Sequence, residues 1–302
     1  MKIAALDLGT NTFLCLIAEG DPTGLTHIYA DLSQVVRLGQ GVGQTGEFHP
    51  EALIRAKDCL TEFKKAMDHH KVEHILAMAT SAARDARNGS ELFKICEDLK
   101  IPLQIIPGQD EARITYAGAL VGHTQDQETC LVVDVGGGST ECILGQGDKI
   151  IFSESLNIGG VRLTEKWITQ QPVPALEQDK LSQYIDSQLQ TILPELKKIK
   201  IDKIIAVAGT PTSIAGIEVG GFDAIKVDGL FLSKERLKFW AQEFARTSVV
   251  EKQTKYNLGG RADIIFSGSL ILLNLLGALQ AEGLTVSTKG VRYGVALEML
   301  RS

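Results

Sequence analysis

Two short segments of the chain carry residue types that bind phosphate and a hard cation. In each, an apolar run ends in an aspartate and leads into glycine and hydroxyl residues: Asp7-Leu8-Gly9-Thr10-Asn11-Thr12 and Asp134-Val135-Gly136-Gly137-Gly138-Ser139-Thr140. Glycines let backbone N–H groups point into a concavity, hydroxyls add donors, and the carboxylate holds a cation such as Mg²⁺. For either segment alone, an ordinary hairpin turn is the alternative, because adjacent glycines are common in hairpins.

The two segments also match each other. The run from Asp7 to Cys15 can be laid on the run from Asp134 to Cys142 without gaps. Each has a carboxylate at the end of an apolar strand, a turn and a second strand. Two such matches, opening halves with the same order of strands and helices, indicate an internal duplication. We therefore expect two similar lobes with a cleft between them.

Two further turns place hydroxyl groups between a strand and a helix. Gly209-Thr210 follows an apolar run, and Thr80-Ser81 follows another, with Arg84 close behind. A helix N-terminus binds anions because its first N–H groups lack partners and its dipole is favourable. Simple N-capping by serine and threonine is the alternative for both turns.

Glu111 lies near the start of a segment with Ile114 and Ala117 on an apolar helix face. One interpretation is a general base that activates water for attack on phosphorus. The other is a first-turn carboxylate that is favourable with the helix dipole. The pattern alone does not choose between them.

Hydrophobic patterning predicts the elements that position these residues. In the first half it predicts strands at 2–8, 13–18, 25–33, 75–79 and 103–106 and helices at 51–70, 90–100 and 109–121. The polar stretch 122–129 marks a boundary, so the expected lobes are 1–124 and 125–302, with the final helix free to pack back on the first lobe. The second half predicts strands at 131–135, 140–144, 149–156, 203–207 and 284–287 and helices at 175–198, 212–217, 233–245, 262–279 and the C-terminus.

Composition narrows the class of protein. The net charge of -6 argues against broad nucleic-acid binding, which normally needs a basic surface. The five scattered cysteines lack a CxxC pair and are typical of reduced core residues in a cytosolic protein. The chain reaches Asp7 too soon for a signal peptide, and the apolar stretch 264–279 is short for a membrane span. We expect a cytoplasmic protein without a membrane segment.

Taken together, the motifs resemble the exopolyphosphatase/guanosine pentaphosphate phosphohydrolase family. The resemblance runs in the same order over nearly the whole chain. Besides the segments opening at Asp7 and Asp134, it is carried by Val36-Arg37-Leu38-Gly39, Ala79-Thr80-Ser81-Ala82-Ala83-Arg84-Asp85-Ala86, Gln109-Asp110-Glu111-Ala112-Arg113, Gly209-Thr210, Arg261-Ala262-Asp263-Ile264-Ile265 and Gly290-Val291-Arg292-Tyr293-Gly294.

The resemblance implies an α/β, duplicated actin-like (ribonuclease-H-like) fold with an interlobe cleft that holds Mg²⁺, or Mn²⁺, and the phosphate chain. It implies Glu111 as the catalytic base, with Arg84 orienting the chain and Arg37 or Arg292 helping. The predicted metal or water-positioning residues are Asp7, Asp134 and Glu141. The predicted phosphate-binding residues are Thr10, Asn11, Thr12, Arg84, Gly136, Gly137, Gly138, Ser139, Gly209 and Thr210.

Two positions depart from the family pattern. Leu14 stands where many members carry a basic residue, and Tyr293 stands where a glutamate is usual. Loss of a cation near the phosphate chain should weaken polyanion binding and shift preference towards shorter phosphates. The chain also resembles the short, two-lobed family form.

The predicted function is therefore an exopolyphosphatase that releases terminal orthophosphate from inorganic polyphosphate by metal-assisted attack of water. A 5′-phosphohydrolase of guanosine pentaphosphate, a kinase-like phosphotransferase and a non-catalytic polyphosphate-binding or signalling module are the alternatives. Pairing into a homodimer stays open.

Overall fold

The chain folds into two compact units. The computed structural model describes residues 1–123 and 127–301. The first unit comprises Met1–Gly118 with Gly290–Ser302, and the second comprises Ala119–Lys289. The predicted boundary between residues 124 and 125 falls within 124–126, outside the described residues. Residues from Gly290 onwards belong to the first unit, and the sequence had left the final helix free to pack there.

The first unit is built on a five-stranded mixed sheet. Its strands are β1 (Lys2–Leu8), β2 (Thr12–Asp21), β3 (Gly24–Val35), β4 (His74–Ala79) and β5 (Leu103–Ile105), in the order β3-β2-β1-β4-β5. The first three form an antiparallel meander, and β4 and β5 add to it in parallel. Strand β1 coincides with the predicted run, β2, β3 and β4 extend beyond theirs, and β5 is one residue shorter than predicted.

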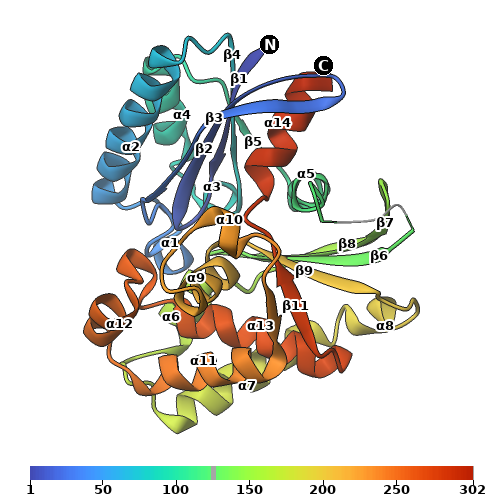
Figure 1. The fold of residues 1–302 in the computed structure, drawn as a ribbon. Coiled ribbons are helices and arrows are strands. Elements are labelled where there is room, and N and C mark those ends of the chain that lie inside the picture. Colours follow the sequence, from blue (N-terminus) through green and yellow to red (C-terminus); the bar gives the residue numbers. More distant parts are fainter. Residues whose placement is uncertain (124–126, 302) are drawn as a thin grey trace. The chain divides into compact units, whose positions relative to one another are not determined.

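Helices cover both faces of this sheet, as the alternation along β1 requires. Ala4, Leu6 and Leu8 face a core shared with α2 (Pro50–His69) and α4 (Gly89–Asp98). Ile3 and Ala5 face the opposite core, formed with α5 (Gly108–Ala119) and α14 (Val291–Arg301). Figure 1 shows α14, in red, lying alongside the blue strands of this unit. The last helix of the chain therefore covers one face of the sheet that contains the first strand.

The second unit repeats this plan with one extra strand. Its strands are β6 (Thr129–Val135), β7 (Thr140–Gln146), β8 (Lys149–Leu156), β9 (Lys203–Val207), β10 (Phe231–Ser233) and β11 (Gly283–Val286). Read from β8, the order β8-β7-β6-β9-β11-β10 matches β3-β2-β1-β4-β5 and then adds β10. Both sheets open with an antiparallel meander followed by parallel strands. The expected duplication is thus visible in the topology.

The helices of the second unit differ from the prediction in two places. The predicted helix 175–198 is divided into α7 (Ala175–Leu189) and α8 (Leu193–Leu196), and Pro194 lies in the first turn of α8, because proline is tolerated there and not in a helix interior. The apolar helix is α13 (Ile265–Leu279), which is buried along most of its length. None of the helices in the described part of the chain combines the length and apolarity needed to cross a bilayer.

The remaining helices include two that were predicted and several short ones that were not. They are α1 (Val42–Thr45), α3 (Ser81–Asp85), α6 (Gly160–Trp167), α9 (Gly209–Glu218), α10 (Ala224–Val227), α11 (Lys234–Arg246), α12 (Val249–Tyr256) and the 3₁₀ helix η1 (Gly259–Arg261). Of these, α9 contains the predicted helix 212–217, and α11 begins and ends one residue after the predicted helix 233–245. The unpredicted α6 begins at Gly160, the second residue of the pair Gly159-Gly160, where the sequence alone suggests a turn.

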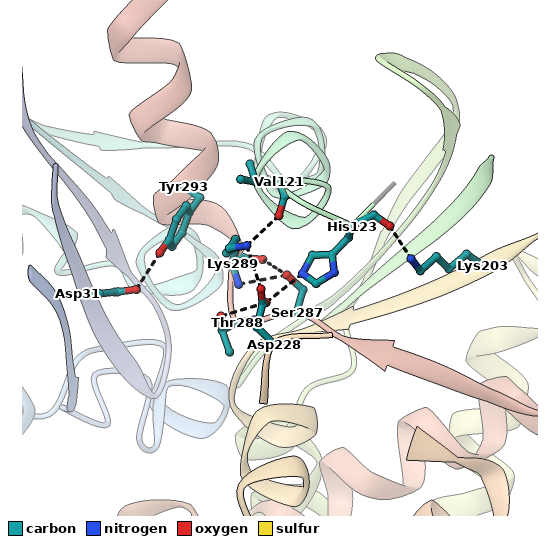
Figure 2. A network of polar contacts seen from close by, with 9 residues as sticks. All are labelled: Asp31, Val121, His123, Lys203, Asp228, Ser287, Thr288, Lys289 and Tyr293. Atoms are coloured by element: carbon teal, nitrogen blue, oxygen red, sulfur yellow. Dashed lines mark hydrogen bonds and ion pairs between the residues drawn. The ribbon is translucent and has the colours of Figure 1, made fainter. Parts of the chain in front are cut away.

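Asp228 joins the two ends of the second unit. Its carboxylate accepts hydrogen bonds from Thr288 N–H and Lys289 Nζ, each at 2.9 Å, and faces His123 Nε2 at 2.9 Å. Lys289 Nζ also donates to the Val121 carbonyl at 2.9 Å, and Figure 2 shows these side chains converging. Although burial opposes ionisation, the hydrogen bonds from His123, Lys289 and Thr288 lower the pKa of Asp228. This network joins the first residues of the second unit, Val121 and His123, to its last residues, Thr288 and Lys289.

Candidate active site

The first turn (residues 9–12) connects β1 to β2 tightly. Gly9 N–H donates to the Thr12 carbonyl at 3.2 Å, and a Cβ at Gly9 would lie 2.9 Å from that same oxygen. Thr10 and Asn11 are buried. A glycine is therefore required at the start of this turn, and the polar side chains that follow it are held inside the protein.

The segment 36–39 holds the first turn in place. The Asn11 carbonyl accepts the N–H groups of Val36 and Arg37 at 3.0 and 2.8 Å, and the Thr10 carbonyl accepts Gly39 N–H at 2.8 Å. A Cβ at Gly39 would lie 2.3 Å from Thr10 Cγ2 and 3.2 Å from Ala82 Cβ. The absence of a side chain at Gly39 thus allows the first turn, the segment 36–39 and α3 to pack together.

The side chain of Asn11 indicates that a ligand binds at the first turn. Its Oδ1 atom is buried and has no hydrogen-bond partner among the described residues, while its Nδ2 makes only a long bond of 3.4 Å to Thr12 Oγ1. A buried acceptor left unpaired costs about 1–3 kcal/mol. A hydrated cation or a water molecule carried by a phosphate would remove that cost.

Arg84 and Glu111 form a buried ion pair in the first unit. Arg84 Nη1 donates to Glu111 Oε2 at 2.7 Å and to the Ile106 carbonyl at 2.9 Å. Glu111 is only 6% exposed. Burial raises the pKa of Glu111, and the charge and hydrogen bond of Arg84 oppose part of that rise. Since a first-turn carboxylate that serves only the helix dipole normally lies in solvent, this environment favours the general-base interpretation.

The second unit pairs two carboxylates in register. Asp134 on β6 lies opposite Glu141 on β7, and Glu141 lies opposite Ser155 on β8. Asp134 and Glu141 are 8% and 1% exposed, and Ser155 Oγ donates to Glu141 Oε1 at 2.7 Å. Oxygen ligands of this kind suit Mg²⁺ or Mn²⁺.

The glycine turn (residues 136–139) follows Asp134 and has the same geometry as the first turn. Gly136 N–H donates to the Ser139 carbonyl at 3.0 Å, as Gly9 N–H donates to Thr12. The carbonyls of Gly136 and Gly137 accept N–H groups at the start of α6, and the Gly138 carbonyl accepts Arg162 Nε at 2.7 Å.

This bonding sets the direction of the amides in the glycine turn. In a trans peptide the C=O and the following N–H point in opposite directions. Because the carbonyls of Gly136, Gly137 and Gly138 are directed at α6 and Arg162, the N–H groups of residues 137–139 are directed away from them. Successive amides with this orientation form an anion-binding concavity.

The two hydroxyl-rich turns do not use their side chains as simple caps. Thr80 occupies the N-cap position of α3 and Ala208 that of α9, and neither helix has a side-chain capping hydrogen bond. Ala208 also adopts a positive φ of 75°, a conformation that residues other than glycine rarely adopt. The capping alternative is therefore not what the structure adopts at either turn.

The family follows from comparison with known proteins. Residues 16–302 match the Ppx/GppA phosphatase family. The chain belongs to the Ppx/GppA phosphatase family. Exopolyphosphatase 2 of Mycobacterium tuberculosis is 30% identical over 99% of this chain and 98% of its own length. The guanosine-5′-triphosphate,3′-diphosphate pyrophosphatase of Photobacterium profundum is 29% identical over 98% of this chain and 59% of its own length.

Solved structures agree with this assignment. The crystal structure of an exopolyphosphatase from Cytophaga hutchinsonii is 26% identical, with a TM-score of 0.90 over 99% of this chain and 98% of that one. The resemblance predicted from the motifs is therefore confirmed, as is an α/β fold with a duplicated strand order.

The predicted residues of this Ppx/GppA phosphatase fall into two groups. The first unit holds Asp7, the first turn and the Arg84–Glu111 pair, and the second holds the Asp134–Glu141 pair, the glycine turn and Gly209-Thr210. In the described part of the chain, no three His, Cys, Asp or Glu side chains cluster as a metal cage.

Leu14 and Glu141 occupy equivalent positions in the two units. Leu14 lies opposite Asp7 on β2, as Glu141 lies opposite Asp134 on β7. The half-buried Leu14 thus takes, in the first unit, the position that a carboxylate takes in the second.

Two arginines near the second-unit turns were assigned no role from sequence. Arg162 anchors the glycine turn, and the Arg261 side chain lies so close to Gly209 that a Cβ there would be 2.6 Å from Arg261 Nε. Burial lowers the pKa of Arg261. Each arginine comes shortly after a glycine pair, Gly159-Gly160 or Gly259-Gly260. At Gly159 the pair marks a close backbone approach, a local signal that could have drawn attention to Arg162.

Proposed function

We propose that this Ppx/GppA phosphatase, a phosphoanhydride hydrolase, is an exopolyphosphatase that releases orthophosphate from the end of inorganic polyphosphate. The observation that carries the proposal is the environment of Glu111, a buried carboxylate. Burial raises the pKa of Glu111, and the hydrogen bond and charge of Arg84 oppose that rise. A buried carboxylate that an arginine holds in place is suited to accept a proton from water. The exopolyphosphatase relative that matches almost end to end supports the choice of substrate.

In the proposed reaction, water attacks the terminal phosphorus and Glu111 takes the proton that the water loses. The terminal P–O anhydride bond breaks, giving orthophosphate and a chain shortened by one phosphate. The N–H groups of residues 137–139 would donate to phosphate oxygens as charge develops there. Arg84 keeps Glu111 in position and would also neutralise phosphate charge.

Asp134 and Glu141 in the second unit, and Asp7 in the first, are the residues proposed to bind the metal. Two observations support a cation: the in-register pair of buried carboxylates and the unpartnered Oδ1 of Asn11. When bound, Mg²⁺ would neutralise charge on the phosphate oxygens.

Guanosine pentaphosphate is the second candidate substrate, and Leu14 favours it. An apolar side chain opposite Asp7 removes a cation that a long polyanion would use, and the relative from Photobacterium profundum is named for that nucleotide.

The proposed compartment is the cytoplasm, which the five free, buried cysteines support.

A phosphate-release assay with Mg²⁺ tests the proposal. It compares short polyphosphate, long polyphosphate, guanosine pentaphosphate and ATP, with a sugar acceptor added to reveal phosphotransfer. Glu111→Gln should keep fold and chain binding but lower phosphate release by about two orders of magnitude or more. Asp110→Asn, at the adjacent exposed carboxylate, is the matched control and should remain active.

Near-normal turnover of Glu111→Gln would remove the base assignment. Tight polyphosphate binding by the wild type without Mg²⁺-dependent phosphate release would favour a non-catalytic module. Light scattering of the same preparation would establish whether the chain forms the homodimer that the sequence leaves open.

A further inference from the structure

Asp7 and Asp31 lie on the same face of the first unit's sheet. Asp7 is paired in register with Leu14 across β1 and β2, and Leu16 is paired with Asp31 across β2 and β3. Because residues two apart on a strand point to the same side, all four side chains share one face. Leu16 on this face packs in the core that includes the first turn of α14.

Arg292, in that first turn of α14, is clamped by Asp31. Its Nε donates to Asp31 Oδ1 at 2.7 Å and its Nη2 to Asp31 Oδ2 at 2.8 Å. This is the bidentate geometry that gives an arginine–carboxylate pair both strength and a defined orientation. Arg292 is buried, with 8% of the residue exposed, whereas the Asp31 side chain keeps 31% of its surface exposed.

Tyr293 completes the clamp from the neighbouring position. Its hydroxyl donates to Asp31 Oδ2 at 3.2 Å, and Figure 2 shows its ring directed at Asp31. The Arg292 guanidinium carbon lies 5.0 Å from the centre of the Tyr293 ring, within the range of a cation–π contact. Tyr293 therefore orients the carboxylate and covers the cation at the same time.

The charge of Arg292 acts on Asp7 as well as on Asp31. Burial opposes the charged form, but the hydrogen bonds and charge of Asp31, with smaller effects of Tyr293 and Asp7, raise the pKa of Arg292. The guanidinium thus stays positive in a buried place on the Asp7 side of the sheet. Because Asp7 and Asp31 share one face of the sheet, the clamp on Asp31 keeps the Arg292 guanidinium on the face that carries Asp7.

We propose that Asp31 and Tyr293 are positioning residues, which hold Arg292 on the Asp7 face of the sheet so that Arg292 fixes the orientation in which the Asp7 carboxylate takes part in cation binding. The proposal rests on the proposed function for the role of Asp7. Asp31 lies on the edge strand of the sheet and touches neither the first turn's backbone bonds nor Glu111. Substitution of Asp31 should therefore change the Mg²⁺ concentration that the reaction needs and leave proton transfer to Glu111 unaffected.

The test combines Asp31→Asn, Asp31→Glu and Tyr293→Phe with Asp58→Asn, an exposed carboxylate on α2, as the control. Two quantities are measured: the Mg²⁺ concentration for half-maximal phosphate release from short polyphosphate, and calorimetric binding of tripolyphosphate with Mg²⁺ in a Glu111→Gln background. Thermal denaturation reports on the fold. Asp31→Asn should raise the Mg²⁺ requirement and weaken Mg²⁺-dependent binding about tenfold, the scale of a lost hydrogen bond to a charged group.

The other variants separate positioning from simple anchoring. Tyr293→Phe should produce about a threefold change, since one neutral donor is lost, and Asp31→Glu should recover part of the effect because it restores the charge. Asp58→Asn should leave both quantities unchanged. A lower melting temperature with unchanged Mg²⁺ dependence, in Asp31→Asn or in Tyr293→Phe, would mean that the clamp only anchors α14 and would overturn the proposal.

The two proposals can fail separately. If the wild type releases no phosphate, the proposed function fails, and calorimetry still decides whether Asp31 controls Mg²⁺-dependent tripolyphosphate binding. If the wild type is active and the Asp31 and Tyr293 variants match it in both measurements, only the positioning role is lost.

Discussion

Replacing Arg84 with alanine would leave the buried Glu111 carboxylate without its cation. Arg84 Nη1 lies 2.7 Å from Glu111 Oε2, and the Glu111 side chain is 7% exposed. Burial raises the pKa of Glu111, and Arg84 opposes that rise. Without Arg84 the pKa of Glu111 should therefore rise further. Because a general base must be deprotonated to accept a proton, a smaller fraction of the enzyme would be active at neutral pH.

The size of the effect follows from the contact that is lost. A hydrogen bond to a charged group contributes about 1.5–3 kcal/mol. The Arg84 side chain is 24% exposed, so solvent screening favours the lower end. A difference of about 1.4 kcal/mol is about tenfold in rate, and we expect Arg84→Ala to lose about that factor in kcat/KM at neutral pH. Arg84→Lys keeps the charge and should lose less.

The assay is kcat/KM for short polyphosphate measured from acidic to alkaline pH. The acidic limb of the Arg84→Ala profile should move to higher pH, and the gap to the wild type should narrow as Glu111 ionises. Arg87→Ala, at an arginine whose side chain is 71% exposed, is the matched control. A gap that stays constant across the pH range would refute the reasoning, because it would assign Arg84 to the phosphate alone.

Two further predictions concern the second unit. Asp228→Asn should lower the free energy of unfolding at neutral pH by about 2–3 kcal/mol through its lost charge-assisted hydrogen bonds, as measured in urea. Hydrogen bonds lower the pKa of Asp228 despite its burial. The stabilisation that Asp228 gives the folded state is therefore present above the ordinary aspartate pKa of 3.8 and is lost as the pH falls below that value. A variant as stable as the wild type at neutral pH would contradict this. Gly159→Ala would place a Cβ 2.5 Å from the Gly137 carbonyl, and by displacing the glycine turn it should raise KM for short polyphosphate about tenfold. Gly277→Ala, which meets nothing within 4 Å, should leave KM unchanged, and equal KM values for the two variants would argue against a role for the turn.

The turns were predictable from sequence because their signals are local. An apolar strand that ends in aspartate, followed by glycine, specifies a carboxylate and a tight reversal within a few residues. The equal spacing of Asp7 to Leu14 and of Asp134 to Glu141 then places each pair in register across a hairpin. That spacing is a property of the chain before any long-range contact forms.

The environment of each functional side chain was not predictable in the same way. Residue type and spacing alone left Glu111 as either a base or a helix-dipole residue, and the family resemblance made it the predicted base. Its burial and its pairing with Arg84, which support that prediction, come from distant segments and follow from no local pattern. The sequence also contained no indication that Asp31 would clamp Arg292, because no short pattern connects a residue on the edge strand with one in the last helix.

By itself the sequence determined the duplicated strand order, the carboxylate and glycine turns and the family. The tertiary structure decided that the last helix returns to the first unit, that the glycine-turn amides face away from Arg162, and that Arg292 stays charged beside Asp31. The physical reason is the range of the interactions. Turn and strand preferences act between neighbours in the chain, whereas burial and ion pairing depend on the path by which distant segments come together.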